Sequence, residues 1–521
     1  MAARLSPSRR EPLVSQPRLR TVVVLAAGEG KRMKSALPKV LHPLLGRTLL
    51  GHVLAAAEPL RADRTVVVVG HGAEQVRAHL AEIASETTPV LQERQLGTGH
   101  AVRIALDAVA EATGTVVVIN GDVPLLRPET VAALVEAHES AGAAATVLAA
   151  EVPDPTGLGR IVRDAAGRLA QIVEERDATA EQRGLREINA GIYAFDVVRL
   201  REALGKLSTD NDQGEEYLTD VFGLLRDAGE PVAVHCAPDH VETLGCNDRV
   251  ELAGLRRLLR DRVNEGWMRT GVSILDPHTT WIDVTVTVER DAVIDQNTQL
   301  QGATVVGTGA LVGPDTTLVD TTVGAGASVV RSHAVGAEVG PQASVGPYAY
   351  LRPQSRLARK AKVGTFVETK KATIGEGSKV PHLSYVGDAT IGEHSNIGAA
   401  SVFVNYDGVR KHHTTIGSHA RTGADNMFVA PVRVGDGAYT AAGSVIVSDV
   451  PPGAMAVARG QQRNVEGWVL RKRAGTAAAE AAQRAREDAS GTASPAREGE
   501  PIHEGPETVG GPVNAGDTAT E

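Results

Sequence analysis

The sequence predicts an α/β domain followed by a parallel β-helix, with disordered segments at both ends. From Thr21 to about Asn247, short β-branched runs alternate with amphipathic stretches. This alternation is typical of a parallel sheet that is buried on both faces and connected by helices. After Gly271 aliphatic residues are repeatedly followed by glycine, and many lie six residues apart. A six-residue period is the signature of the hexapeptide β-helix.

Composition and charge exclude several classes of protein. The chain has 521 residues, enough for two to four domains, and only 3% of them are aromatic. Two cysteines, Cys236 and Cys246, cannot form a disulfide framework or a zinc cage. No apolar run reaches the roughly 18–20 residues of a membrane helix, and the N-terminus lacks the apolar core of a secretion signal. With a net charge of −9, we expect a cytoplasmic protein that neither enters membranes nor binds nucleic acid.

The α/β domain is expected over residues 21–249. Its strands are the runs TVVVLAAG, TVVVVG and GTVVVIN, and helical spacing lies between them over 72–82 and 98–112. Residues 1–20 are rich in Arg, Pro and Ser without hydrophobic period, so a flexible arm is expected. A linker helix is expected over 250–271, because positions 252, 255, 258, 259 and 263 place apolar side chains on one helix face.

The β-helix domain is expected over residues 272–470. Aliphatic side chains would point inward, and the glycines would permit tight corners. Three hexads to a coil give about ten coils, about 50 Å of strand stacking, with a projecting loop where 407–414 break the rhythm. A Val- and Gly-rich sandwich with accidental spacing is the alternative. Residues 471–521 are acidic and poor in large apolar groups, so a disordered tail is expected. The six-residue spacing is clearest in Val339, Val345, Leu351, Leu357 and Val363, and in Ile416, Thr422, Phe428, Val434, Thr440 and Ile446.

A nucleotide site is predicted where the first and third strands end. Gly28 and Gly30 follow the first strand, and glycines there let backbone N–H groups approach a phosphate. Arg32 and Lys39 can neutralise phosphate charge. Asp122 follows the third strand, at the edge where open α/β sheets bind ligands, and its carboxylate suits Mg²⁺. Taken singly, the glycines could form a plain turn and Asp122 a cap; the loop is not a Walker A motif, since Lys31 is followed by Arg.

Several longer motifs resemble the sugar-nucleotide uridylyltransferase family. They are LAAGEGKRM, LPKVLHPLLGR, QLGTGHAV, NGDVPLL, GRIVRD, IVEERDAT and EINAGIY. With the hexapeptide domain behind them, residues 21–470 are similar to the bacterial bifunctional N-acetylglucosamine-1-phosphate uridylyltransferase/glucosamine-1-phosphate acetyltransferase family. The resemblance implies a Rossmann-like nucleotidyltransferase domain followed by a left-handed parallel β-helix. It also implies a role in UDP-N-acetylglucosamine synthesis, which feeds peptidoglycan and other cell-envelope glycans.

The resemblance assigns roles in a uridylyltransferase site, with UTP as co-substrate and one Mg²⁺. Asp122 and Asn247 match the metal-holding pair, and Lys39 matches a phosphate-contacting lysine. Since the attacking phosphate is already an anion, charge neutralisation and alignment would be the main work of the site. Asn120 stands where some relatives have an aromatic residue, which puts a ring contact there in doubt. The loop that holds the uridine nucleotide would consist of Leu25, Ala26, Ala27 and Gly28. The residues that read uracil would be Gln92, Gly97 and Thr98. The contacts to the N-acetylglucosamine moiety would be Gly159, Glu174 and Asn189.

The resemblance also implies an acetyltransferase site on the β-helix. His382 matches the proton acceptor, a role that suits histidine near neutral pH. Judged from the residues alone, His382 could be an ordinary surface histidine. Lys370-Lys371 could be a solvated edge that protects a strand from further pairing. Ala424 stands where relatives often place a serine, which puts one hydroxyl contact in doubt. Sugar-phosphate ligands would be Arg352, Lys370, Tyr385 and Asn396; acetyl-coenzyme A contacts would be Ala399, Asn405, Tyr406, Ala424, Ala442 and Arg459.

Two other functions are alternatives to the bifunctional enzyme. A sugar-1-phosphate nucleotidylyltransferase with a regulatory or structural β-helix would have no reason to keep His382 with Arg352 and Lys370. A non-catalytic scaffold built on the same modules predicts degraded nucleotide motifs, whereas those here are intact. No acyl-enzyme is expected, because neither cysteine lies in the β-helix. The family also implies a homotrimer with sites between subunits.

Overall fold

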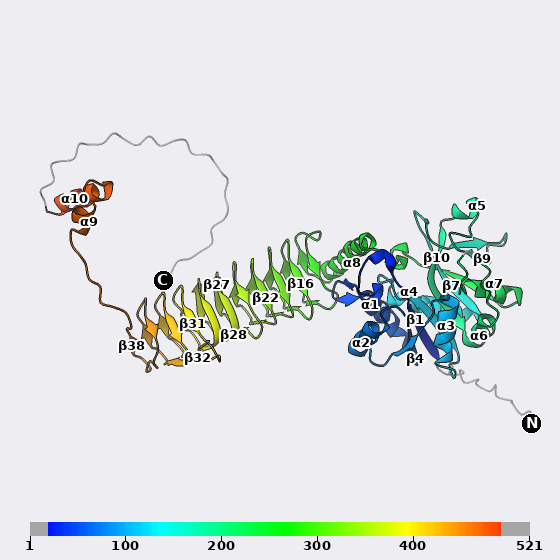
Figure 1. The fold of residues 1–521 in the computed structure, drawn as a ribbon, viewed down its shortest axis with the longest axis horizontal. Helices are drawn as coiled ribbons and strands as arrows, with labels where there is room; N and C mark the ends of the chain where they lie inside the picture. Colours follow the sequence, from blue (N-terminus) through cyan, green and yellow to red (C-terminus); the bar gives the residue numbers. More distant parts are fainter. Residues whose placement is uncertain (1–18, 212, 491–521) are drawn as a thin grey trace, which may run out of the picture. The chain divides into compact units, whose positions relative to one another are not determined.

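The computed structural model describes residues 19–211 and 213–490, and the chain divides into two compact units, Met1–Ala458 and Arg459–Glu521. The first unit contains an α/β domain and a long run of parallel strands in a curled sheet, which confirms the predicted fold class (Figure 1). Most of the expected arm, residues 1–18, lies outside the described residues. The first strand begins at Arg20, so the sheet starts within the segment expected to be an arm.

The α/β domain is built on a mixed sheet with the strand order β11-β7-β10-β6-β1-β4-β5. Strands β1, β4, β5 and β6 are parallel, as predicted. Strand β10 runs antiparallel to both β6 and β7, which the sequence did not predict. A small extension, β8 and β9, pairs with the edge of β10. The bounds are β1 (Arg20–Ala26), β4 (Arg64–Val69), β5 (Thr88–Leu91), β6 (Thr115–Asn120), β7 (Ala145–Glu151), β8 (Arg160–Arg163), β9 (Leu169–Val173), β10 (Glu187–Asp196) and β11 (Val232–Cys236).

Helices cover both faces of this sheet. Alternate β1 residues face opposite ways, so Val22 and Val24 pack with α1, α2 and α4, whereas Val23 packs with α3, α6 and α7. Both strand faces are therefore apolar, which explains the solid β-branched runs. The helices are α1 (Leu49–Ala57), α2 (Ala73–Ile83), α3 (Thr98–Asp107), α4 (Pro128–Ala141), α5 (Ala180–Arg183), α6 (Val197–Leu204) and α7 (Asp220–Asp227); the short antiparallel hairpin is β2 (Pro43–Leu44) with β3 (Arg47–Thr48).

Helix α8 (Arg249–Arg269) occupies the segment in which a linker helix is expected. The Asp248 side chain caps it by accepting hydrogen bonds from Val250 N and Glu251 N. Leu252, Leu255 and Leu259 pack in one cluster with residues of the first domain. The β2–β3 hairpin reaches the first coil as well, since Val284 N donates to Leu45 O at 3.1 Å.

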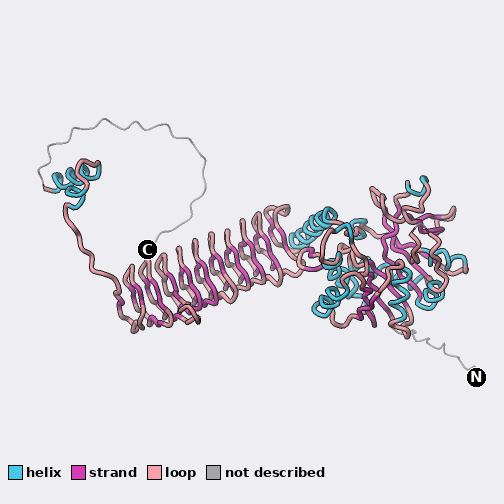
Figure 2. Tube along the Cα trace, viewed as in Figure 1, coloured by secondary structure: helices cyan, strands magenta, loops and turns pink. Residues whose placement is uncertain are grey.

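The strands that follow stack in parallel, coil upon coil, as Figure 2 shows. The arrangement is consistent with a left-handed β-helix. The strands are β12 (Ser273–Ile274), β13 (Trp281–Ile282), β14 (Thr287–Val288), β15 (Val293–Ile294), β16 (Gln299–Gln301), β17 (Val305–Val306), β18 (Leu311–Val312), β19 (Thr317–Val319), β20 (Thr322–Val323), β21 (Ser328–Val329), β22 (His333–Val335), β23 (Glu338–Val339), β24 (Ser344–Val345), β25 (Tyr350–Leu351), β26 (Arg356–Leu357), β27 (Lys362–Thr365), β28 (Glu368–Ile374), β29 (Lys379–His382), β30 (Tyr385–Ile391), β31 (Val402–Val404), β32 (Thr414–Ile416), β33 (Arg421–Thr422), β34 (Met427–Val429), β35 (Val432–Val434), β36 (Tyr439–Thr440), β37 (Val445–Ile446) and β38 (Met455–Ala456).

The six-residue series supplies the core of this domain. Every member of both predicted series is buried. The glycines have a different role from the one predicted. Gly340 and Gly375 do not have a positive φ; instead, a Cβ on either would lie 2.5 Å from a carbonyl oxygen of the next coil. The positive-φ corners are often occupied by larger residues such as Gln342 and Lys360. The glycines are thus required for the close approach of successive coils.

A loop interrupts the stack after Asn405, where the sequence predicted one. Ile374 pairs with Ile391, which is 17 residues further along the chain. Ile391 pairs with Ile416, which is further away in the sequence, and the additional residues form the loop. The loop is tied together by Asp407, which accepts hydrogen bonds from Val409 N and Arg410 N and pairs with His412. These interactions lower the pKa of Asp407 to about 2.

The second unit contains helices α9 (Trp468–Lys472) and α10 (Ala477–Ala489). Helix α10 lies within the segment that was expected to be disordered, and its Ala-rich sequence favours a helix. Its start is capped by Thr476, whose hydroxyl accepts from Ala479 N. The acidic residues beyond 490 lie outside the described residues. Among the helices of the described ranges, none is long and apolar enough to cross a membrane.

Candidate active sites

The first site lies at the carboxyl ends of β1 and β6. Strand β1 lies between β4 and β6, and the strand order reverses there, which is where open α/β sheets form a ligand crevice. Leu25 is paired with Asn120, so the glycine loop after β1 and Asp122 after β6 emerge side by side. Gly28 is exposed, and a Cβ on it would meet nothing within 4 Å. The loop backbone is therefore open to a ligand.

Four charged or polar side chains meet in this crevice. The Lys39 ammonium forms an ion pair with Asp122, and both side chains are largely buried, 14% and 21% exposed. Asn247 Oδ1 lies 3.5 Å from Lys39 Nζ and accepts a hydrogen bond from Arg32 at 2.8 Å. The structure thus brings together Lys39, Asp122 and Asn247, which come from three distant segments of the sequence.

The oxygens of Asp122 and Asn247 fit a magnesium site that is completed by a substrate. Both oxygens lie next to one cation, the Lys39 ammonium, so they already face the position of a positive charge. The described residues hold no cluster of three or more His, Cys, Asp or Glu that could bind a metal on its own. Mg²⁺ commonly takes one or two protein oxygens and fills its remaining positions with phosphate oxygens and water. This donor set is of that kind.

The predicted uracil readers also lie together. Gln92 is buried, and its Nε2 donates to Gly97 O at 3.2 Å. Thr98 Oγ1 accepts a hydrogen bond from Leu218 N, and Glu216 O accepts from Gly99 N. The segment 215–218 therefore supports the loop that carries the predicted uracil readers Gly97 and Thr98. This segment was not identified from the sequence, because it contains no recognisable motif.

The predicted sugar contacts form a cluster beside β10. Gly159 O accepts from Asn189 N at 2.9 Å, and a Cβ on Gly159 would lie 3.3 Å from Glu174 Oε2. Burial raises the pKa of the Glu174 carboxyl, and the hydrogen bond from the Thr219 hydroxyl lowers this pKa by a smaller amount. The Asn189 amide donates to Tyr193 OH at 2.8 Å. Thr219 and Tyr193 were not predicted, although Tyr193 lies in the quoted EINAGIY motif.

On the β-helix, cations gather on the coils formed by β25, β28 and β30. Arg352 pairs with Glu368 at 2.8 Å. The pKa of Lys370 is lowered, chiefly by the neighbouring Lys411. Two close ammonium groups favour an anion between them. Sequence reasoning did not single out Lys411, although it lies in the loop that breaks the six-residue rhythm.

The other predicted acetyltransferase residues lie on neighbouring coils. Asn405 Nδ2 donates to Asp388 at 2.6 Å and lies 3.4 Å from Tyr385 OH. His382 ends β29, three residues before Tyr385; its side chain is exposed and has no hydrogen bond within the described ranges. Asn396 is half-buried and bridges Lys379 and Arg421 through the backbone.

The predicted coenzyme contacts follow one corner of successive coils. Ala399 O accepts from Asp425 N, and Ala424 O accepts from Gly443 N, so Ala399, Ala424 and Ala442 lie on one column of turns. Small side chains at such a column leave its backbone accessible to an extended ligand. Tyr406 is 56% exposed, whereas Arg459 belongs to the second compact unit.

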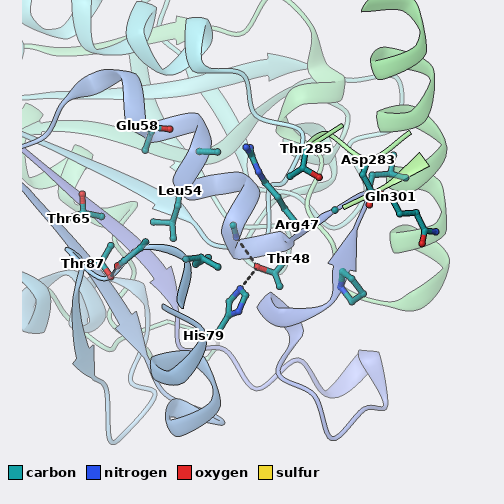
Figure 3. Close-up of a pocket in the computed structure, with 18 of the residues that line it drawn as sticks. Arg47, Thr48, Leu54, Glu58, Thr65, His79, Thr87, Asp283, Thr285 and Gln301 are labelled. Atoms are coloured by element: carbon teal, nitrogen blue, oxygen red, sulfur yellow. Dashed lines mark hydrogen bonds between the residues drawn. The ribbon is translucent and has the colours of Figure 1, made fainter. Parts of the chain in front are cut away.

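A cavity of 1290 Å³ lies elsewhere, between α1, α2 and the first coils (Figure 3). None of its described lining residues is a predicted site residue. Arg47, Arg61 and Arg256 are balanced by Glu58, Glu86 and Asp283. Thr48 closes part of its wall through a 2.9 Å hydrogen bond to His79. This cavity is therefore separate from both predicted sites.

Fold and first site together define a nucleotidyltransferase joined to a hexapeptide β-helix. Residues 22–190 match the MobA-like NTP transferase domain. The chain is 63% identical over 472 residues to the bifunctional protein GlmU of Streptomyces coelicolor, covering 90% of this chain and 98% of that protein. It is 61% identical to the Thermobifida fusca GlmU (91% and 99%) and 56% identical to the Corynebacterium glutamicum GlmU (89% and 96%). The chain belongs to the GlmU family of bifunctional proteins. The predicted family is confirmed, and with it the prediction of a bifunctional transferase enzyme.

Proposed function

We propose that the enzyme first acetylates glucosamine 1-phosphate with acetyl-CoA and then transfers UMP from UTP to N-acetylglucosamine 1-phosphate. The second reaction releases pyrophosphate and yields UDP-N-acetylglucosamine for peptidoglycan and envelope glycans. The observation that carries this proposal is the presence of two separate charged clusters. One is Lys39 with Asp122 and Asn247 in the nucleotidyltransferase domain; the other is Arg352 with Lys370 and Lys411 on the β-helix.

In the uridylyltransferase site, the sugar phosphate oxygen attacks the α-phosphorus of UTP, and the bond to the pyrophosphate oxygen breaks. Lys39 and Arg32 neutralise phosphate charge, so that the two anions can approach in line. Asp122 and Asn247 would hold Mg²⁺, which supplies charge stabilisation for the phosphates when it is bound. Lys39, whose ammonium pairs with Asp122 in this structure, would contact a substrate phosphate. No general base is required, since the nucleophile is already ionised.

Recognition at the first site divides between two groups of residues. Leu25, Ala26, Ala27 and Gly28, with Gln92, Gly97 and Thr98, would hold the uridine nucleotide. Gly159, Glu174 and Asn189 would contact the N-acetylglucosamine moiety. The loop residues end β1, the uracil readers follow β5 on one side of it in the sheet order, and the sugar contacts lie on or beside β8, β9 and β10 on the other side, which suits a ligand that lies across the crevice.

In the acetyltransferase site, the amine nitrogen attacks the thioester carbon, and the carbon–sulfur bond breaks to release coenzyme A. His382 accepts the proton that the amine loses. Arg352, Lys370, Tyr385 and Asn396 would hold the sugar phosphate, and Ala399, Asn405, Tyr406, Ala424, Ala442 and Arg459 would contact acetyl-CoA. Transfer is direct, because both cysteines belong to the first domain.

Assembly and location follow from the same proposal. A single β-helix face offers an open surface, so we propose a homotrimer in which neighbouring β-helices complete each acetyltransferase site. UTP and acetyl-CoA are intracellular metabolites, so the enzyme would act in the cytoplasm. The functional regions would be 21–249 for uridylyl transfer, 250–271 as linker and 272–470 for acetyl transfer.

One assay tests both activities on the full chain. Glucosamine 1-phosphate, acetyl-CoA, UTP and Mg²⁺ are supplied, and free thiol and pyrophosphate are measured. Asp122→Ala should lower pyrophosphate release at least 100-fold and leave thiol release unchanged. His382→Ala should lower thiol release about 10²–10⁴-fold, and its pyrophosphate release is measured with N-acetylglucosamine 1-phosphate supplied directly, where it should equal that of the wild type. Thiol release by neither the wild type nor its variants would favour the nucleotidyltransferase with a structural β-helix. If each variant lost both activities, the two-site proposal would be wrong.

A further inference from the structure

A fully buried arginine lies next to the proposed sugar contacts of the first site. Arg160 opens β8, directly after Gly159, and only 1% of it is exposed. Its guanidinium forms an ion pair with Glu175 at 2.7 Å and donates to Arg183 O at 3.2 Å and to Leu158 O. Burying a guanidinium is costly unless it is paired and hydrogen-bonded, so this arrangement requires an explanation.

Each of the three partners flanks a proposed sugar contact or its support. Leu158 immediately precedes Gly159, and Glu175 immediately follows Glu174. Arg183 ends α5, the helix between Glu174 and the strand that carries Asn189. A second contact strengthens the link, because Arg183 Nε donates to Glu175 O. Arg160 therefore fastens the Gly159 loop to the segment 174–183.

The guanidinium suits this role better than other side chains. Its planar fork can bind two carbonyls and a carboxylate in fixed directions, whereas a lysine offers one compact charge. Stability alone does not account for it, since a buried ion pair is often no more stable than an apolar replacement. Neither Arg160 Nε nor Glu175 Oε2 has a hydrogen-bond partner among the described residues, so the pair is held by charge, which adds to the cost of burial.

We propose that Arg160 is a positioning residue for the sugar half of the first site. It does not contact the substrate; it sets the separation of Gly159 and Glu174, and hence the affinity for the sugar 1-phosphate. The inference depends on the proposed uridylyl transfer to N-acetylglucosamine 1-phosphate. The inference also separates the two substrates, because within the described residues Arg160 forms no hydrogen bond or ion pair with the loop after β1 or with Gln92.

The test is Arg160→Lys in the full-length enzyme, with steady-state pyrophosphate release measured against each substrate in turn. We expect the KM for N-acetylglucosamine 1-phosphate to rise about tenfold or more, while the KM for UTP stays within twofold. Arg163→Lys is the matched control. Arg163 lies on the same strand and pairs with Glu187, but its side chain is 38% exposed and does not join the two segments. The control should leave both KM values unchanged.

A second variant keeps the inference testable if Arg160→Lys fails to fold. Glu175→Gln keeps the shape of the side chain but removes its charge, and should raise the sugar KM about threefold without changing the UTP KM. An equal rise in both KM values, or no change in either variant, would overturn the positioning role. Failure of the proposed function would be distinct: the wild type itself would then not release pyrophosphate with this sugar phosphate.

Discussion

Gly97 allows the sharpest prediction about the uridine half of the site. Its φ is +108°, a conformation that L side chains rarely adopt, and a Cβ there would lie 2.5 Å from Glu216 O. An ordinary contact begins at 3.4 Å, so Gly97→Ala must move the loop or the segment 215–218 by about 0.9 Å. With ψ at 175°, this backbone conformation is essentially restricted to glycine, and the strain adds about 1–3 kcal/mol.

The displacement falls on the loop that carries the proposed uracil readers. A shift of about 1 Å in a positioning element can lower a rate about 100-fold. We therefore expect kcat/KM for UTP to fall about 30- to 100-fold in the pyrophosphate assay. Acetyl transfer, measured as thiol release by the same preparation, should be unchanged.

Gly142→Ala separates strain from collision. Gly142 also has a positive φ, +58°, but a Cβ on it would meet nothing within 4 Å. It ends α4, so its substitution should lower stability by about 1–2 kcal/mol and leave both activities intact. A kcat/KM for UTP within threefold of wild type in Gly97→Ala would refute the reasoning. An equal loss in Gly142→Ala would attribute the effect to general destabilisation.

Two further predictions concern stability. Burial raises the pKa of the Glu174 carboxyl, so the folded state binds its proton more tightly than the unfolded chain does. The contribution of this carboxyl to the free energy of unfolding therefore falls as the pH rises from the ordinary carboxyl pKa through the raised one. Glu174→Gln should therefore gain melting temperature relative to wild type as the pH rises above the ordinary carboxyl pKa, while the sugar KM rises. A difference in melting temperature that does not change with pH would contradict this prediction. Phe403→Ala should destabilise the β-helix by about 3–5 kcal/mol, because Phe403 is fully buried against Phe428, with ring centroids 5.0 Å apart. Calorimetry would measure the loss; Phe403→Leu should lose less, and an equal loss in both variants would argue against ring packing.

The fold could be predicted wherever a periodic pattern determined it. The strand runs and the two six-residue series give side-chain direction directly, and the structure buries them. The antiparallel strand β10 was not predicted, because its apolar run does not encode the direction of its neighbours. The role of the coil glycines was misjudged for a similar reason. Close approach of Gly340 to the next coil is a contact between turns, which local dihedral preference does not reveal.

The sequence predicted the residues of the site themselves, but not the neighbouring residues that hold them in place. The position of Asp122 beside the glycine loop follows from the strand order, and Lys39 and Asp122 both lie in recognisable motifs. Asn247 lies outside the quoted motifs, and only the resemblance assigned it to the site. Glu216 and Lys411 lie in segments without periodicity, and their relation to the sites depends on tertiary packing. Arg160 was visible only as part of GRIVRD, since nothing in the sequence shows that it is buried.

The stacked coils also constrain how this chain can change length. The coils from β13 to β23 carry none of the residues proposed to bind substrate, and each coil contacts mainly its immediate neighbours. A whole coil could be added or removed there with little effect on the chemistry at either end. A residue inserted within a strand would turn the inward side chains of that strand outward. A residue inserted at a corner can be absorbed, since Leu300 pairs with Leu318, 18 residues on, whereas Leu318 pairs with Ala334, only 16 residues on. This stretch is therefore expected to tolerate whole-coil changes and small changes at its corners, but not insertions inside its strands.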